Sequence, residues 1–318
     1  MRHWAPYVVI SCVALAFTPP SIAQSAYPNR DIHLVVGYAP GSGPDITTRR
    51  LADALRKASG QTVIVENKPG ALTNIAAVSV ARAKPDGYTI FVTAGNSTMA
   101  ANPWLFKNLP YDPIRDFTPV TSLLKTPFLF AVPQNSPLNS VSELTTSLKQ
   151  KGGKAKYAYA NSISLAAAEL YKHKAGIDAI GVAYKSIVDS HAALAAGEVD
   201  FFIADVTFKD KAKLLALTVA ERSPVLPNIP SAAEAGLDNF DLGAWWGIWL
   251  PAGAPREIVD KLADWTDAFT ASDENHEFTF ARGNQPWIGV RGKALEQFTI
   301  AEIKKWGDAI KAAGIEPQ

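Results

Sequence analysis

Short apolar runs that end in glycine- and proline-rich turns alternate with helical patterns along most of this 318-residue chain. The runs at 32–37 (IHLVVG) and 62–66 (TVIVE) both end in such turns, and a helical pattern at 45–59 lies between them. A short apolar run before a turn is typical of a buried strand. Strand–helix–strand units of this length predict a parallel sheet covered by helices on both faces, which is the α/β fold class.

The middle of the chain repeats this pattern. We expect strands at 156–160, 179–184, 199–204 and 214–219, and helices at 164–175 and 189–196. Ser140 and Ser231 each stand three residues before a glutamate, which is the pattern of a helix capping box. After 245–250 the pattern is helical to the end of the chain.

Two α/β halves of this size predict two domains. We place residues 24–124 plus 248–318 in domain 1 and residues 125–247 in domain 2. One continuous strand within 117–137 would cross from the first half to the second, and 245–250 would be the return path. Each domain is expected to be a mostly parallel sheet flanked by helices.

The N-terminus has the composition of a signal peptide, which we assign to residues 1–23. Arg2 and His3 precede an 11-residue apolar run, which small residues follow (YVVISCVALAF, then SIA). The run is too short to span a bilayer, which needs about 20 apolar residues. This assignment predicts cleavage after Ala23 or Ala26 and a periplasmic location. The alternative is that the segment is not cleaved and forms an amphipathic or buried N-terminal helix. Cleavage also removes Cys12, the only cysteine, so no disulfide is expected.

The balance of charged residues argues against a nucleic-acid partner, and the arrangement of histidine and serine residues argues against an enzyme. Lysine and arginine number 31 against 30 acidic residues, so no overall field attracts nucleic acid or an anionic membrane. The five histidines have no zinc-ligand spacing, so no metal is expected. Ser42 lies between prolines 40 and 44, where a nucleophile elbow would need glycine. We therefore expect no catalytic residue and no cofactor.

Three small polar loops each follow a predicted strand and precede a predicted helix, at 38–45, 67–73 and 160–164. Such loops cluster at the carboxyl ends of parallel strands, where ligands bind. The N–H groups at a helix start favour an anion, and Gly41 and Gly43 would let the backbone approach it closely. The loops therefore predict a carboxylate site held by main-chain amides and hydroxyls; the alternative is that they are ordinary tight turns.

Motifs along the mature chain resemble one family of extracytoplasmic receptors. The segments YPNRDIHLVVGYAPGSGPDITTRRLADAL, VIVENKPGALTNIAA, AKPDGYTI, VAYKSIVDSHAALAAGEVDFFIAD, PNIPSAAEAGLDNF and WWGIWLPAGAPREIVDKL are similar to the solute receptors of the tripartite tricarboxylate transporter group, the Bug family. The resemblance implies a two-domain periplasmic binding protein of the Venus-flytrap, type II-like, class. It also implies a ligand held between the two lobes.

The resemblance also implies which residues bind the ligand. Carried over by position, these are Tyr38, Ala39, Gly41, Ser42, Gly43, Asp45, Asn161, Ser162, Ser164, Tyr184, Lys185 and Asp205. For Asp45 the residue pattern itself favours capping of its helix. The chain departs from the family at Leu72, Thr73, Asn161, Ile163, Leu165 and Ser186. Larger and less polar residues at these positions are compatible with a ligand that has more apolar surface.

The expected function is capture of a small organic acid, a dicarboxylate or an aromatic carboxylate, by a monomeric periplasmic protein. The partners implied by the resemblance are the integral-membrane subunits of a transporter. Two alternatives stay open: a liganded form that signals to a membrane sensor, and a periplasmic hydrolase that uses Ser42 with a nearby histidine.

Overall fold

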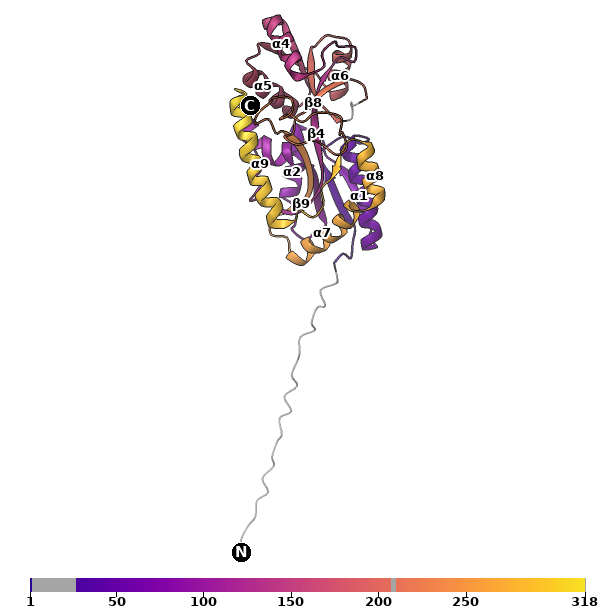
Figure 1. The fold of residues 1–318 in the computed structure, drawn as a ribbon. Helices are drawn as coiled ribbons and strands as arrows, with labels where there is room; N and C mark the ends of the chain where they lie inside the picture. The colour runs from indigo at the N-terminus through magenta and orange to yellow at the C-terminus, as the bar shows by residue number, and fades with distance from the viewer. Residues whose placement is uncertain (2–26, 207–209, 318) are drawn as a thin grey trace.

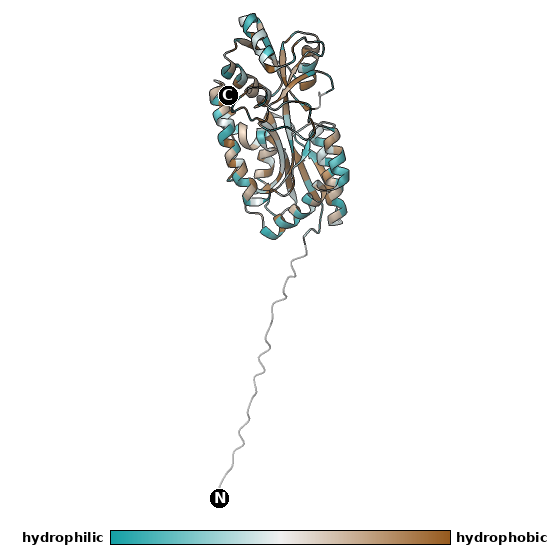
Figure 2. Cartoon of the chain, viewed as in Figure 1, coloured by the Kyte–Doolittle hydropathy of each residue, from teal (hydrophilic) through white to brown (hydrophobic). Residues whose placement is uncertain are grey.

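The computed structural model describes residues 27–206 and 210–317, together with Met1, and the predicted signal segment lies outside these residues. Figure 1 shows an elongated α/β molecule with strands through its middle and helices around them. Apolar residues concentrate in the strands, whereas many outward-facing helical residues are polar (Figure 2). In the described part of the chain, no helix is long and apolar enough to cross a membrane.

The first sheet is built around three parallel strands. β1 (Ile32–Val36) lies between β2 (Val63–Asn67) and β3 (Thr89–Ala94) and pairs with both in parallel. Side chains alternate along β1, so that Ile32 and Leu34 share a core with α1 (Gly43–Ser59), while Val35 packs with α2 (Asn74–Ala81). Helices therefore cover both faces of this sheet, as the sequence predicted.

The second sheet has the same plan. β5 (Ala155–Tyr159) lies between β6 (Ala179–Ala183) and β7 (Phe201–Asp205) and pairs with both in parallel. Its remaining elements are α4 (Val141–Lys151), η3 (Gly152–Lys154), α5 (Ser162–Ala175), α6 (Ile187–Ala195) and β8 (Lys213–Leu217). In Figure 1, α4, α5 and α6 lie at the top of the molecule, away from α1 and α2.

Two long strands join the sheets. β4 (Phe117–Val132) is one continuous 16-residue strand, as predicted, and its two halves pair with different sheets. β9 (Gly243–Pro251) is the return strand and pairs antiparallel with β3 and with the first half of β4. Each sheet is mixed: its strand–helix–strand units are parallel, and its antiparallel pairs involve β4 or β9.

The C-terminal third is helical with one interruption that the sequence analysis did not predict. α7 (Arg256–Thr270) and α8 (Asp273–Ala281) precede a short strand, β10 (Gln285–Pro286), which pairs with β4. α9 (Gly292–Ala312) then packs Leu295 against the first sheet and Trp306 and Ile310 into the core that contains α5. α9 therefore ties the two halves together along one side of the molecule (Figure 1).

The second predicted capping box has its hydrogen bonds but no helix. The Ser231 N–H donates to the Glu234 carboxylate at 2.9 Å, and the Glu234 N–H donates to the Ser231 hydroxyl at 3.3 Å. Turns follow instead of a helix, because the chain reaches a glycine with positive φ at Gly236. Local hydrogen bonding at a helix start does not by itself extend the helix.

Candidate ligand-binding site

The first predicted loop joins β1 to α1 and turns at Gly41, whose φ is +79°. Ser42 is the N-cap of α1: its hydroxyl accepts from the Asp45 N–H at 3.4 Å and donates to the Ala39 carbonyl at 2.7 Å. Gly43 is the first residue of α1, so its amide has no acceptor inside the helix, and Pro44, the second residue, has no N–H. Gly43 is exposed and a Cβ added there would meet nothing within 4 Å, so a ligand can approach this positive helix end.

Asp45 holds the first loop, and Ser42, rather than Asp45 as the sequence favoured, is the N-cap of α1. Its side chain is 2% exposed. Oδ2 accepts from the Gly41 N–H at 2.8 Å and from Arg49 Nε at 2.9 Å, and Oδ1 accepts from Asn67 Nδ2 at 2.8 Å. Burial opposes the charge, but these donors outweigh it and hold the pKa of Asp45 below its usual value. The Gly41 amide is therefore engaged by the protein itself.

Ser42 has no histidine among its hydrogen-bond partners in the described residues. Its hydroxyl is occupied by the two main-chain groups of its own loop. This geometry caps a helix, and it does not activate a nucleophile.

Tyr38 brings the first loop against the strand that links the two sheets. Its ring centroid lies 5.4 Å from that of Trp246, with the planes tilted by 45°. Trp246 lies on β9 opposite Ala94, at the carboxyl end of β3. Burial raises the pKa of the Tyr38 hydroxyl, and a hydrogen bond with Ser97 partly offsets this rise. Three elements that are distant in sequence therefore meet beside the start of α1.

A fourth strand-to-helix corner, at the end of β3, was missed by the sequence analysis. There η2 (Asn96–Ala101) has π-helical geometry and continues into α3 (Asn102–Leu105). Asn96 is 2% exposed, and its Oδ1 has no hydrogen-bond partner among the described residues. The small polar run Gly95-Asn96-Ser97 after a predicted strand was the available signal, since it has the composition of the three predicted loops. π-helical turns are frequent at functional sites.

The second predicted loop contains three consecutive non-glycine residues in the left-handed conformation. Ala71, Leu72 and Thr73, which form the short helix η1 (Ala71–Thr73), have φ values of 45°, 51° and 73°. Each left-handed residue costs roughly 1–2 kcal/mol. Buried polar contacts stabilise the turn: Asn102 Nδ2 donates to the Leu72 carbonyl at 3.0 Å, and Thr73 Oγ1 lies 2.6 Å from Thr98 Oγ1. The chain thus keeps a left-handed turn here without glycine at 72 and 73.

Replacing Ala71 with glycine is expected to raise the free energy of unfolding by up to about 1 kcal/mol, because glycine adopts positive φ without strain. Ala71 is exposed, so no packing is lost. Urea denaturation measures the change. Ala196→Gly is the matched control, since Ala196 is also exposed and has φ of −75°. The free energy of unfolding of the control should fall by about 0.5–1 kcal/mol. A fall of the same size in Ala71→Gly would show that the positive φ at Ala71 is not strained.

The third predicted loop is a helix cap. Asn161 Oδ1 accepts from the Ser164 N–H at 2.8 Å, and the Ser164 hydroxyl donates to the Asn161 carbonyl at 3.1 Å. Both side chains are therefore used inside the loop, and the ligand contact of Ser164 that the resemblance implies stays a prediction. The side chain of Ser162 lies outside what the structure describes. At the start of α5, the main-chain N–H groups of Ser162 and Ile163 lie before the capped Ser164 amide and have no acceptor inside the helix.

The remaining predicted residues lie on other parts of the second sheet. Tyr184 and Lys185 follow β6, which is the outermost strand, and Lys185 is exposed. Ser186 is the N-cap of α6. Asp205 ends β7 opposite Phe128 of β4, close to where β4 passes between the sheets. Among the residues that the structure describes, no hydrogen bond or ion pair joins Tyr38 or Gly43 to Asn161, Tyr184 or Lys185.

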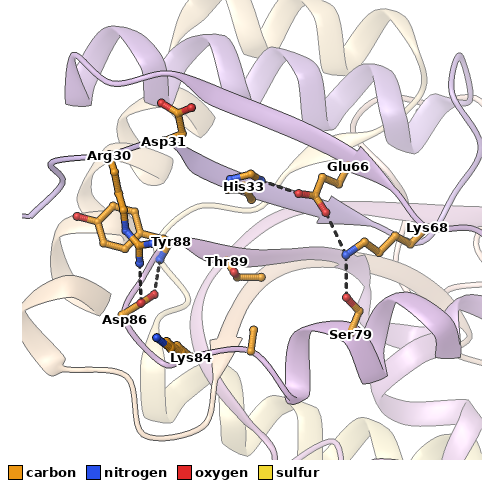
Figure 3. Close-up of a pocket in the computed structure, with 11 residues that line it drawn as sticks. Arg30, Asp31, His33, Glu66, Lys68, Ser79, Lys84, Asp86, Tyr88 and Thr89 are labelled. Carbon is orange, nitrogen blue, oxygen red and sulfur yellow. Dashed lines mark hydrogen bonds and ion pairs between the residues drawn. The ribbon is translucent and has the colours of Figure 1, made fainter.

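A groove of about 640 Å³ lies at the opposite part of the first sheet, between β2 and α2. Figure 3 shows that its charges pair with one another: Glu66 lies 2.5 Å from His33 Nδ1 and 3.0 Å from Lys68 Nζ. Lys68 also donates to Ser79 at 2.8 Å. Lys68 is the main cause that holds the pKa of Glu66 below its usual value, against a smaller effect of burial. Among the described residues, no group of three or more His, Cys, Asp or Glu could hold a metal ion.

The chain is similar in sequence and fold to known binding proteins. Residues 47–315 match the model of the tripartite tricarboxylate transporter family receptor, TctC. Rhodopseudomonas palustris Rpa4515 with adipate is 31% identical, with a TM-score of 0.82 over 92% of this chain and 100% of that one. The periplasmic binding protein BugD is 30% identical, with a TM-score of 0.80 over 92% and 100% of the two chains. MatC from R. palustris with bound malate is 31% identical, with a TM-score of 0.77 over 89% and 100%.

The family match covers well over half of the chain, and the matching structures have the two-lobe fold of periplasmic binding proteins. Members of this family are binding receptors, which removes the hydrolase alternative. The chain therefore belongs to the tripartite tricarboxylate transporter receptor family, the group that includes the Bug proteins.

Proposed function

We propose that the protein binds a small organic carboxylate between its two lobes and delivers it to an integral-membrane transporter. The observation that carries the proposal is the exposed start of α1, where the Gly43 amide has no acceptor inside the helix, a Cβ at Gly43 would meet nothing within 4 Å, and Ser42 and Asp45 fix the loop. A helix N-terminus in this state favours an anion. Two related proteins of known structure hold adipate and malate, which supports a carboxylate as the ligand.

In this proposal the second lobe contributes the start of α5. The N–H groups of Ser162 and Ile163 are left for a ligand, because Asn161 already caps Ser164. Closure of the lobes would bring this second amide pair onto a ligand bound at Gly43, and contacts made only in the closed form would stabilise that form. Asp205 lies beside β4, the strand that passes between the lobes. We therefore expect the surroundings of Asp205, among the predicted acidic residues, to change most when the lobes close.

The proposed lobes have the boundaries predicted from the sequence, 24–124 plus 248–318 and 125–247. The passage of β4 from the first sheet to the second supports a hinge near residue 125. We propose that residues 1–23 direct export to the periplasm and that the mature protein acts as a monomer. The family match supports the location and the transporter partner.

The aromatic pair Tyr38 and Trp246 supports a ligand with an apolar or aromatic body. Trp246 is partly exposed, and it lies beside the loop that carries Gly43. Arg49, which is bonded to this loop, already pairs with Asp45. The carboxylate would therefore be held by amides, while the rings contact the ligand body.

Carboxylates should stabilise the protein against heat. A ligand at 100 times its dissociation constant is expected to add about 2.7 kcal/mol to the free energy of unfolding. Adipate, malate and benzoate are compared by thermal shift and then by calorimetry. No response to any carboxylate would contradict the proposed function.

Replacing Trp246 with alanine is expected to weaken binding of an aromatic or long-chain acid about tenfold, because a ring contact of about 1–1.5 kcal/mol is lost. Malate, which has little apolar surface, should lose less. The control is Trp265→Ala, because Trp265 stacks on Tyr27 at 6.5 Å; Tyr27 bonds Gly87 before the start of β3, whereas Trp246 lies opposite Ala94 at the end of that strand. Equal losses for malate and the apolar acids would show that Trp246 does not contact the ligand body.

A further inference from the structure

A second cavity, of about 460 Å³, lies behind the strands that link the two sheets. Its walls come from both halves of the chain: Lys125 on β4, the loop at 219–223, and Trp287 and Phe298 near α9. Trp245 lines this cavity, whereas its neighbour Trp246 contacts Tyr38 on the other face of β9. Successive strand residues point to opposite faces, so the cavity and the proposed carboxylate site lie on opposite sides of β9.

One wall of the cavity is aromatic. The ring centroids of Trp287 and Phe298 are 4.7 Å apart, and that of Trp245 lies 5.1 Å from Phe298 and 6.0 Å from Trp287. Trp287 and Phe298 are only partly buried and line the cavity, and the flexible Lys125 side chain places its Nζ over both rings, 4.4 and 5.4 Å from their centroids. A flat apolar ligand could stack here, since ring pairs at such distances are favourable.

The charges of the cavity leave one cation without an acidic partner. Lys305 lies 2.5 Å from Glu302 and 3.3 Å from Asp241. Arg222 pairs with Glu234 at 2.9 Å. Lys125 Nζ, in contrast, lies 4.4 Å from the centroid of the Trp287 ring, and no carboxylate among the described residues is within ion-pair distance of it. Its side chain stays exposed, so an incoming anion can reach it.

A buried hydroxyl in the same lining also lacks a partner. Ser223 is 6% exposed, and its Oγ has no hydrogen-bond partner among the described residues. A buried polar group without a partner costs roughly 1–3 kcal/mol, so it favours any ligand atom that can bond to it. Ser223 and Lys125 therefore provide two donors in one cavity.

We infer that this cavity is a second binding site, separate from the proposed carboxylate site, for a small aromatic monocarboxylate. The ring stacks on Trp287 and Phe298, and the carboxylate accepts from Lys125 and Ser223. One carboxylate suffices, because the other two cations are already paired. A second negative charge on the ligand would meet Glu221, Asp241 and Glu302, which also line the cavity.

The site has a physical connection to the proposed carboxylate site through Trp245. A Cβ on Gly95 would lie 2.1 Å from the Trp245 ring, so the ring lies directly on the corner that follows β3. Ser97 of the same corner hydrogen-bonds the Tyr38 hydroxyl. Trp245 Nε1 also donates to Glu302 on α9 at 3.1 Å. A ligand stacked beside Trp245 would therefore contact the ring that packs on Gly95, in the corner whose Ser97 bonds Tyr38 of the first loop.

The test follows the indole N–H resonances of Trp287 and Trp245 in the purified protein during titration with benzoate. We expect saturable shifts of both resonances, and Lys125→Gln should weaken the dissociation constant about tenfold, because a charge-assisted hydrogen bond is lost. Ser223→Ala should weaken it less. Lys304→Gln is the matched control, since Lys304 is exposed on α9, pairs with Asp308 and does not line the cavity. Succinate should not shift Trp287.

Three outcomes would overturn the inference. These are no saturable shift at Trp287, a shift that is unchanged in Lys125→Gln, and a Trp287 shift that disappears in Trp246→Ala. The last would place benzoate on the other face of β9. Binding of adipate and malate to Trp246→Ala tests the proposed carboxylate site, whereas the Trp287 resonance with benzoate tests the second site. Failure of one can therefore be told from failure of the other.

Discussion

Replacing Gly95 with alanine is expected to lower the melting temperature by roughly 5–10 °C, because one added methyl group would overlap a buried tryptophan ring. Gly95 has φ of −67° and ψ of −32°, so alanine has no conformational difficulty there. The added Cβ, however, would lie 2.1 to 2.5 Å from three atoms of the Trp245 ring. Trp245 is 2% exposed and is enclosed by Trp249, Trp287 and Phe298, so the ring cannot move without disturbing this cluster.

Thermal and urea unfolding of Gly95→Ala measure this effect. The control is Gly43→Ala, because a Cβ at Gly43 meets nothing within 4 Å and the residue also begins a helix after a strand. Its stability should stay within about 1 kcal/mol of the parent protein. If Gly95→Ala were as stable as Gly43→Ala, the packing of Trp245 against the β3 corner would be wrong.

Replacing Asp45 with asparagine is expected to reduce the free energy of unfolding by about 2–3 kcal/mol and to weaken carboxylate binding at least about tenfold. Asparagine has the same shape, but its amide places a donor where Asp45 Oδ2 accepts from the Gly41 N–H and Arg49. The first loop then loses the contact that fixes its turn beside Gly43. Urea denaturation and calorimetry with adipate measure the two losses.

The stability contributed by Asp45 should depend on pH in one direction. Its pKa in the folded protein lies below the ordinary value of 3.8, so the unfolded chain takes up a proton first as the pH falls. The contribution is therefore complete above about pH 4 and is lost as the pH falls through the lowered pKa of the folded state. The difference in stability between the parent and Asp45→Asn should shrink over that acidic range and stay constant from pH 5 to 7.

Asp53→Asn is the matched control for both measurements. Asp53 lies on the same helix, but its side chain is 66% exposed and it pairs only with Arg56 at 3.3 Å. An exposed pair of this kind contributes at most about 0.5 kcal/mol. Equal effects of the two substitutions, or an Asp45→Asn variant that binds adipate normally, would contradict the proposed role of Asp45 in fixing the loop.

The local part of the site was predictable because it depends on neighbours in sequence. Ser42 and Asn161 cap their helices because a short polar side chain before a helix bonds the third amide. The glycine at 41 has the positive φ that its turn needs. These features follow from residues at most four positions apart, so the sequence contains all of the atoms involved.

The roles of Asp45 and Ser164 were predicted less well, because each has several possible partners. Asp45 could cap, bind a ligand or pair with a cation, and Asn67, 22 residues away, completes its set of donors. Ser164 could donate to a ligand, but its hydroxyl bonds back to Asn161. A side chain is free for a ligand only if the folded chain leaves it free, and that depends on the whole arrangement.

The sequence by itself determined the alternation of strands and helices, the crossing strand within 117–137, the places of the polar loops and the family, because periodicity, turn residues and motifs are local properties. Only the tertiary structure decided which distant residues meet. Trp246 reaches Tyr38, and Trp245 reaches Gly95 and Phe298, because β9 pairs with β3 and β4 across more than a hundred residues of chain. Such pairing is chosen by the packing of the complete core, which no local pattern encodes.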